Sequence, residues 1–352
     1  MITVQFKLLP NPEQKRLLLG MSAEYISSAN DLIDYCCAQY GHPKLSSASF
    51  IAVLPSSVKN EVVNTVKSIM RKYEQGACAS LPVLRKPVVT WNNQNYKVKD
   101  GGIEFPVWEN GRSKRIFVKM IVKEYQLTRL ANRLGALRIT QKNGKWVAQI
   151  AVEIKAAEPT GGSVMGVDLG LKVPAVAMAD TGKAKFSGNG RMNKYVRRKN
   201  RARRKALGKA KKQKAIIKLG NKEQRWMKDQ DHKISREVVN FAISNGVGTI
   251  RMEKLQNIRE TARTSRKNEK NLHTWSFYRL AGFIEYKANM AGIKVEYVDP
   301  AYTSQTCPVC GIRNHAKDRD YHCSCGFKSH RDKVGAINII NAPVIGGNSR
   351  SA

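Results

Sequence analysis

Three acidic residues lie in positions that are typical of a divalent-metal site. Asp168 lies midway in the apolar run 164–170, where a carboxylate is costly to bury unless it binds a metal, a hydrogen-bond donor or another cation. Glu253 ends a second apolar run, and Asp332 lies at the start of the last predicted helix. Acids on two strand ends and one helix start can hold two Mg²⁺ ions about 3.5–4 Å apart, an arrangement that activates a water and stabilises the leaving oxygen of a phosphodiester.

Each of these acids also has an ordinary alternative. Asp168 could be a hydrogen-bonded core residue, Glu253 a surface residue and Asp332 a helix cap. The prediction of a metal site therefore depends on their joint presence in a chain whose formal charge is +35.

A cluster of four cysteines, Cys307, Cys310, Cys323 and Cys325, predicts a structural zinc site with Zn–S distances near 2.3 Å. The other three cysteines are scattered, and an odd count with one tight cluster indicates an intracellular metal site rather than a disulfide framework. The second pair is Cys-x-Cys, one residue shorter than the usual Cys-x-x-Cys. His322 and His330 therefore remain alternatives for one sulfur, and free cysteines remain the alternative to a metal site.

The charge of the chain predicts a polyanionic partner, for which nucleic acid is the default. Residues 191–228 contain 17 Lys or Arg and one acid, Glu223. A helix there would be positive all round and would contact phosphates rather than base edges, the alternative being a solvated or disordered basic segment. The residues predicted to bind nucleic acid are Arg197, Arg198, Lys199, Arg201, Arg203, Arg204 and Lys205.

The elements that position these residues are predicted to form two to three domains, as 352 residues allow. An alternating strand at 2–9 precedes two helical stripes within 12–76, the first of which is predicted to begin with Asn11 as its cap and Pro12 at the first helical position. Short β-rich runs with Asn-Gly turns fill 82–157. We interpret this half as a small antiparallel barrel that the first strand joins and into which the helices are inserted.

A linker at 159–163 precedes the second half of the chain. Strands are predicted at 164–170, 175–178, 247–252 and 293–298, with helices at 275–291 and 331–342 and a frayed tail at 346–352. The chain has no apolar run of about 18 residues and no secretory leader, so neither a transmembrane helix nor a signal peptide is expected.

Four motifs, in this order and spacing, resemble TnpB, the family of transposon-encoded RNA-guided DNA endonucleases that is similar to the compact type V CRISPR effectors. The resemblance is specific over 164–342 and loose before 160. The motifs are Gly166–Gly170 (GVDLG), Met252–Leu255 (MEKL), Tyr302–Gly311 (YTSQTCPVCG) and Asp332–Ile339 (DKVGAINI).

The resemblance implies a multidomain α+β and α/β fold. A wedge barrel would comprise 1–10 and 77–157, with a helical recognition domain at 11–76 inserted in it. A RuvC-like, RNase H-like nuclease domain would comprise 163–305 and 327–345, with a zinc ribbon at 306–326 that binds the target nucleic acid. The tail would be 346–352.

The resemblance also implies the chemistry and the partners. Asp168, Glu253 and Asp332 would be catalytic and would bind Mg²⁺, with Mn²⁺ as an alternative, and the four cysteines would bind Zn²⁺. The partners would be a guide RNA and double-stranded target DNA beside a short flanking motif. No membrane association would be expected, and each guide RNA would be bound by one chain or by a dimer. The location would be the prokaryotic cytoplasm, at the nucleoid when DNA is bound.

Several features within the resemblance have open roles. Val334 and Gly335 replace the usual Asn and Ala of the last motif. His232 could pack or contact phosphate, and 257–271 is similar to the family's mobile lid. The aromatic residues Trp226, Trp275, Phe277 and Tyr278 could stack on a base or pack in the core.

Three other functions are compatible with parts of the sequence. An RNA-guided repressor that does not cut would be expected to have lost an acid, and this chain retains all three. A compact CRISPR effector differs from TnpB only in its genomic neighbourhood. A zinc-ribbon transcription factor leaves the acids unexplained.

Overall fold

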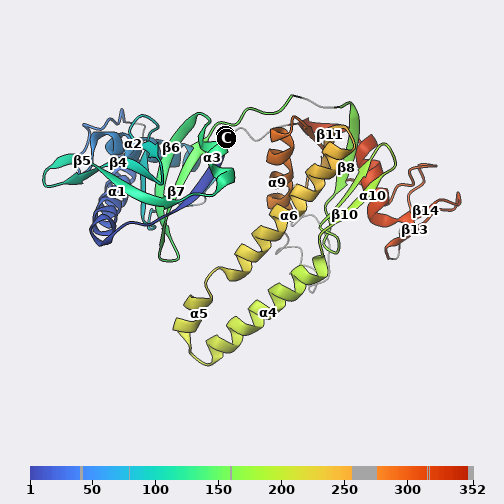
Figure 1. The fold of residues 1–352 in the computed structure, drawn as a ribbon. Coiled ribbons are helices and arrows are strands. Elements are labelled where there is room, and N and C mark those ends of the chain that lie inside the picture. The colour runs from blue at the N-terminus through green and yellow to red at the C-terminus, as the bar shows by residue number, and fades with distance from the viewer. Residues whose placement is uncertain are drawn as a thin grey trace. The chain divides into compact units, whose positions relative to one another are not determined.

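A computed structural model describes residues 1–39, 43–78, 80–158, 161–255, 276–314, 316 and 318–347. The chain forms two compact units, Met1–Ile154 and Lys155–Ala352, which Figure 1 shows in colour order. The lid expected at 257–271 and Trp275 lie outside the described residues. Within the described ranges, none of the helices is long and apolar enough to cross a membrane.

Unit 1 is built on a curled seven-stranded antiparallel sheet with the strand order β2-β6-β7-β1-β5-β4-β3. The first strand pairs with β7 along its length and with β5 near its end, as predicted. No ladder joins the edge strands β2 and β3 within the described ranges, so the sheet is a half-barrel rather than a closed barrel. The strands are β1 (Ile2–Leu8), β2 (Val88–Trp91), β3 (Lys97–Lys99), β4 (Gly102–Glu109), β5 (Arg112–Ile121), β6 (Leu134–Lys142) and β7 (Lys145–Val152).

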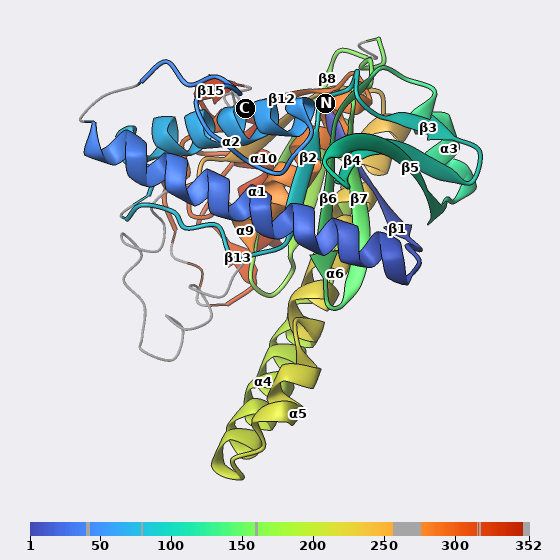
Figure 2. The same cartoon turned by 90° about the vertical axis from the view of Figure 1, so that its left-hand side faces the viewer.

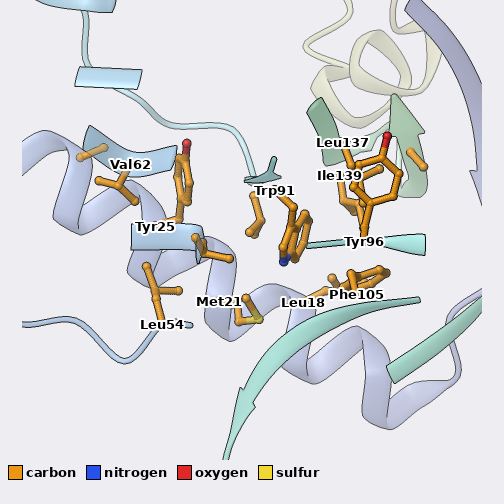
Figure 3. Packing of buried hydrophobic residues seen from close by; sticks show 14 of the residues in the cluster. Leu18, Met21, Tyr25, Leu54, Val62, Trp91, Tyr96, Phe105, Leu137 and Ile139 are labelled. Atoms are coloured by element: carbon orange, nitrogen blue, oxygen red, sulfur yellow. The ribbon is translucent and has the colours of Figure 1, made fainter. Parts of the chain in front are cut away.

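The helices of unit 1 are α1 (Pro12–Ala38), α2 (Ser56–Glu74) and α3 (Glu124–Leu130). Asn11 caps α1 by accepting from the Gln14 amide, and Pro12 occupies the first turn, as the sequence predicts. The helix α1 lies across one face of the sheet (Figure 2). Its buried stripe packs around Trp91, whose ring centroid is 4.7 Å from that of Phe105 (Figure 3).

Unit 2 contains a six-stranded mixed sheet with the order β10-β9-β8-β11-β12-β15. The central strands β8, β11 and β12 are parallel, and the outer ones are antiparallel. Gly346 and Gly347 pair with β12, so the expected tail begins later than predicted. The strands are β8 (Ser163–Asp168), β9 (Ala175–Ala179), β10 (Ala184–Ser187), β11 (Val247–Glu253), β12 (Lys294–Val298) and β15 (Val344–Gly347).

The helices of unit 2 cover both faces of this sheet. Met165 and Val167 of β8 lie in one core cluster with Ile234 of α6 and Ile284 of α9. Gly166, between them, faces the other way, toward the backbone of α10. These helices are α6 (Lys222–Ser244), α9 (Phe277–Met290) and α10 (Arg331–Asn341).

The basic segment forms a helical hairpin. The helix α4 (Gly190–Lys209) runs outward from the sheet, α5 (Gln213–Leu219) lies at the far end, and α6 returns to the sheet (Figure 1). A small hairpin of β13 (Asp320–His322) and β14 (Lys328–His330) precedes α10 and carries the second cysteine pair between its strands.

Candidate active site and cysteine cluster

The sheet of unit 2 brings the three predicted acids to one edge. Asp168 and Glu253 are the last residues of β8 and β11, which are parallel neighbours with Val167 opposite Met252. Asp332 lies in the first turn of α10, which packs on β8. A Cβ atom on Gly335, one turn further along α10, would lie only 3.1 Å from Oδ2 of Asp168. The carboxyl ends of two parallel strands and one helix start therefore converge.

Neighbouring side chains hold two of these carboxylates. The Thr303 hydroxyl donates to Oε1 of Glu253, and the Arg319 guanidinium donates to Oδ1 of Asp332 in an ion pair. The Asn338 amide donates to the carbonyl oxygens of Thr303, at 2.6 Å, and Thr306, at 2.7 Å. The loop at 303–306, before the cysteine cluster, is therefore hydrogen-bonded both to Glu253 and to α10, the helix that carries Asp332.

The carboxylates repel one another electrostatically. Burial raises the pKa of Asp168 well above its ordinary value, and the nearby charges of Glu253 and Asp332 raise it further, against Arg319 and Arg331. Burial also raises the pKa of Glu253, partly offset by the Thr303 hydrogen bond. The cluster therefore has more negative charge than its protein neighbours neutralise.

The donor set fits a hard divalent cation. Oδ2 of Asp332 is buried and has no hydrogen-bond partner, although a buried carboxylate oxygen normally has one. Carboxylate oxygens are the ligands that Mg²⁺ prefers. Asp332 is not the helix cap, because the cap of α10 is His330, whose Nδ1 accepts from the Asp332 amide at 3.2 Å.

The four cysteines form a second cluster. Within the described residues they alone form a group of three or more potential metal-ligating residues whose ligand atoms all lie within 4.8 Å of one another. The Sγ atoms of Cys307 and Cys325 are 3.7 Å apart, and those of Cys310 and Cys323 are 3.4 Å apart. A tetrahedral site with Zn–S bonds near 2.3 Å requires sulfurs about 3.8 Å apart, so the cluster has nearly the required size.

Two glycine turns shape this cluster. The Gly311 amide donates to the Cys307 carbonyl and the Gly326 amide to the Cys323 carbonyl, each at 3.0 Å. Both glycines have φ in the left-handed region, at 72° and 89°. The shortened second pair therefore still brings its sulfurs together.

Neither histidine alternative is part of the four-sulfur group. His330 caps α10 and lies edge-on to Phe186, with ring centroids 5.1 Å apart. His322 is exposed on β13.

The seven predicted nucleic-acid contacts all lie on α4, but they differ in exposure. Arg197 and Arg204 are half-buried. The Arg204 guanidinium donates to the Gly220 carbonyl at 2.8 Å, and burial lowers the pKa of Arg197. The exposed members are Arg198, Lys199, Arg201, Arg203 and Lys205.

His232 has a packing role. Its ring stacks on Phe283 with centroids 4.0 Å apart, and its carbonyl accepts from Nζ of Lys287 at 2.6 Å. Burial, with the nearby charge of Lys287, lowers the pKa of His232 to about 4. The ring is therefore neutral at pH 7 and provides no positive charge for a phosphate.

The aromatic residues that were considered for base stacking differ in environment. Phe277 is buried and packs in the core, whereas Trp226 is half-buried and Tyr278 is exposed.

Sequence reasoning missed three side chains around the acids. Thr303 and Asn338 lie inside the recognised motifs, so their presence there was the available signal. Arg319 has no such signal, because only the folded hairpin brings it to Asp332.

The chain matches two family models. Residues 148–259 match a family described as "Probable transposase", and residues 277–339 match the "Cas12f1-like, TNB domain". These two matches include Asp168, Glu253, Asp332 and the four cysteines.

Curated relatives match over most or part of the chain. A CRISPR-associated endodeoxyribonuclease Cas12f1 of Sulfoacidibacillus thermotolerans is 29% identical over 92% of this chain and 77% of its own length. A TnpB-like protein of Methanocaldococcus jannaschii is 35% identical over 45% of this chain and 58% of its own length.

The fold is similar to that of a solved nucleoprotein complex. It is the cryo-EM structure of a Cas12f1–sgRNA–target DNA complex, which superposes with a TM-score of 0.70 at 18% identity and covers 94% of this chain and 82% of its own. The mixed α+β architecture expected from the sequence is therefore that of a Cas12f1 chain.

Proposed function

We propose that this chain, which matches the "Probable transposase" and "Cas12f1-like, TNB domain" models and is similar to TnpB-like proteins and Cas12f1 endodeoxyribonucleases, is a transposon-encoded RNA-guided DNA endonuclease. A guide RNA pairs with one strand of target DNA, and the protein reads a short flanking duplex motif and the shape of the hybrid. The observation that carries the proposal is the convergence of Asp168, Glu253 and Asp332 at one sheet edge, with one carboxylate oxygen buried and unpartnered.

The three acids hold Mg²⁺, with Mn²⁺ as a substitute. When bound, a pair of such ions supplies an activated water and stabilises the leaving oxygen. The oxygens of the three acids do not all lie within 4.8 Å of one another, which suits a pair of ions better than one shared ion.

The protein's own groups orient these acids. Thr303 fixes the rotamer of Glu253 through its hydroxyl, while Arg319 occupies one oxygen of Asp332 and leaves the other free. Gly335 has no side chain, so it leaves room for the carboxylate of Asp168 beside α10.

The domain roles follow the same proposal. Residues 163–305 and 327–345 form the RuvC-like nuclease, and 306–326 form a ribbon whose four sulfurs hold one structural Zn²⁺. Residues 1–10 and 77–157 form the wedge, and 11–76 the recognition domain. The spacing of the four sulfurs supports the zinc assignment, and no coordination position is left for catalysis.

The basic hairpin binds nucleic acid. Five of its exposed cations, Arg198, Lys199, Arg201, Arg203 and Lys205, contact phosphates, a role that requires charge and reach but no base reading. Such a complex assembles where DNA lies, which in a prokaryotic cell is the cytoplasm.

The first experiment identifies and reprograms the guide. The chain is expressed with its flanking DNA, and the RNA that copurifies is sequenced. Replacing the guide segment should move the cut on a plasmid to the newly matched site. Cutting that does not follow the guide, or copurified RNA without a shared sequence, would contradict the proposal. A guide that maps to a CRISPR array would instead identify the chain as a compact CRISPR effector.

A further inference from the structure

Tyr302 has an unusual backbone conformation beside the acids. Four non-glycine residues in the described ranges have φ in the left-handed region: Asn110, Asn143, Lys211 and Tyr302, the last with φ 61°. Both asparagines precede glycines in hairpin turns, where this conformation is common. For a bulky residue such as tyrosine this conformation is strained.

Hydrogen bonds hold this strained residue in place. The Tyr302 carbonyl accepts from the amides of Gln305, at 2.9 Å, and Thr306, at 3.0 Å. The next residue, Thr303, donates to Glu253 and accepts from Asn338. The strained residue therefore directly precedes Thr303, which contacts the carboxylate cluster. Strained backbone conformations often occur at functional sites.

The Tyr302 ring does not contribute to the core. It is 49% exposed, although the Arg313 guanidinium lies over it, with Cζ 3.7 Å from the ring centroid. By contrast, Tyr321 of the same hairpin region is fully buried, and its hydroxyl donates to the Gln305 carbonyl at 2.9 Å. A glycine could adopt the Tyr302 backbone conformation without strain, and packing in the core does not explain why a tyrosine ring is present at this position.

We propose, on the basis of the proposed function, that Tyr302 and Arg313 form a stacking platform for an unpaired base of the DNA strand that is cut at the acids. An aromatic ring and an arginine plane both stack on any base, so they hold a single strand without reading its sequence. The platform is fixed to Glu253 through Thr303, so a base seated on it keeps the adjoining phosphate near the carboxylates.

The first test combines variants with abasic substrates. Tyr302→Ala should slow single-turnover cleavage of guide-matched DNA by roughly 5- to 150-fold, the range that loss of one base stack gives. Tyr302→Phe should restore most of the rate. Tyr302→Gly, which also relieves the backbone, should be as slow as Tyr302→Ala. An abasic site at one position near the cut should slow the wild type similarly and the Tyr302→Ala variant no further.

A matched control is available in unit 1. Tyr125 is 54% exposed and also has an arginine over its ring, Arg129 at 5.5 Å, but it belongs to α3. Tyr125→Ala should leave the cleavage rate unchanged. Zinc content and thermal unfolding of the Tyr302 variants should match the wild type, which separates stacking from a structural role in the ribbon.

The second test does not depend on cleavage. A 2-aminopurine is placed in turn at each position of a single-stranded oligonucleotide bound to the guide-loaded protein. Its fluorescence should be quenched at one position by the wild type and by Tyr302→Phe, and not by Tyr302→Ala or Tyr302→Gly. Arg313→Ala should weaken the quenching.

The outcomes separate the two proposals. Equal quenching by Tyr302→Ala, or equal cleavage by it when the wild type cuts, overturns the platform alone. A wild type that does not cut guide-matched DNA contradicts the proposed function, and the quenching pattern then still decides the platform.

Discussion

Substitution of Gly166 by alanine should separate the acids without removing any of them. A Cβ atom at this position would lie 2.0 Å from the Ala336 carbonyl oxygen and 3.0 Å from Cγ1 of Ile340, both on α10. Ordinary contact begins at 3.4 Å, so the helix must retreat by about 1.4 Å, the difference between the two distances. Since β8 carries Asp168 and α10 carries Asp332, the retreat widens the gap between these two acids.

Two magnitudes follow from this displacement. Overpacking of this kind lowers the free energy of unfolding by about 1–3 kcal/mol. A misplacement of about 1 Å at a reacting centre costs on the order of 10²-fold in rate. We therefore expect Gly166→Ala to be folded at 25 °C and to cut guide-matched DNA at least about 100-fold more slowly than the wild type.

The assay is single-turnover cleavage, with thermal unfolding and a target-binding gel shift on the same samples. Gly162→Ala is the matched control, because Gly162 precedes the same strand, has no atom within 4 Å of the added Cβ and lacks a left-handed φ. Wild-type cleavage by Gly166→Ala would refute the reasoning. Loss of guide binding equal to the loss of cutting would show that the fold, and not the acid spacing, had failed.

Three further predictions concern the cysteines, the basic hairpin and His232. Metal analysis should find one zinc per chain, and Cys310→Ser should lose this zinc. The variant should also lose cutting, because Arg319 of the ribbon contacts Asp332. A zinc-free variant with full activity would contradict this prediction. Guide-RNA affinity should fall by roughly 10³–10⁵ between 50 and 200 mM salt if about 6–10 phosphates are neutralised. Alanines at Arg198, Lys199, Arg201, Arg203 and Lys205 should flatten this dependence, and an unchanged slope would show that α4 does not bind phosphates. The pKa of His232 is about 4 in the folded chain and near 6.5 in the unfolded chain, so the unfolded chain binds this proton more tightly. The free energy of unfolding should therefore fall as the pH drops from about 6.5 to about 4. His232→Phe should remove that part of the pH dependence in denaturant titrations, and an identical pH profile would show that His232 is not buried as a neutral ring.

The sequence predicted best those features that residues close together in the chain determine. The cap Asn11 and the following Pro12 locate the start of α1, whereas Asp168, expected midway in the apolar run 164–170, is the last residue of β8. The cysteine spacing predicts the four-sulfur cluster because two tight turns fix the sulfurs locally. The acids were predicted to act together because all three occur in a strongly basic chain, but the parallel pairing of β8 and β11 that brings Asp168 beside Glu253 is seen only in the structure.

Features that depend on contacts between distant segments could not be predicted. The pairing of Arg319 with Asp332, the contact of Gly335 with Asp168 and the stack of Arg313 on Tyr302 all join segments whose register only the fold defines. The predicted small antiparallel barrel is present as a curled half-barrel, and whether β2 and β3 pair depends on the curvature of the sheet, which alternation alone does not specify. The basic segment was predicted as helical, but the breaks at 210–212 and 220–221 that turn it into a hairpin were not.

Cleavage and target binding by Asp168→Ala, measured on one guide-matched duplex at one Mg²⁺ concentration, test the central claim most directly. The account predicts that cutting falls below detection while guide and target binding stay within about twofold, because binding rests on phosphate contacts and base pairing. Removing a buried carboxylate whose pKa is raised should not destabilise the metal-free protein, so its unfolding temperature should be no lower than that of the wild type. Glu253→Ala and Asp332→Ala should also fail to cut. Near-normal cutting by Asp168→Ala would contradict the assignment of the three acids, and an equal loss of binding would show that Asp168 maintains the fold rather than the cutting site.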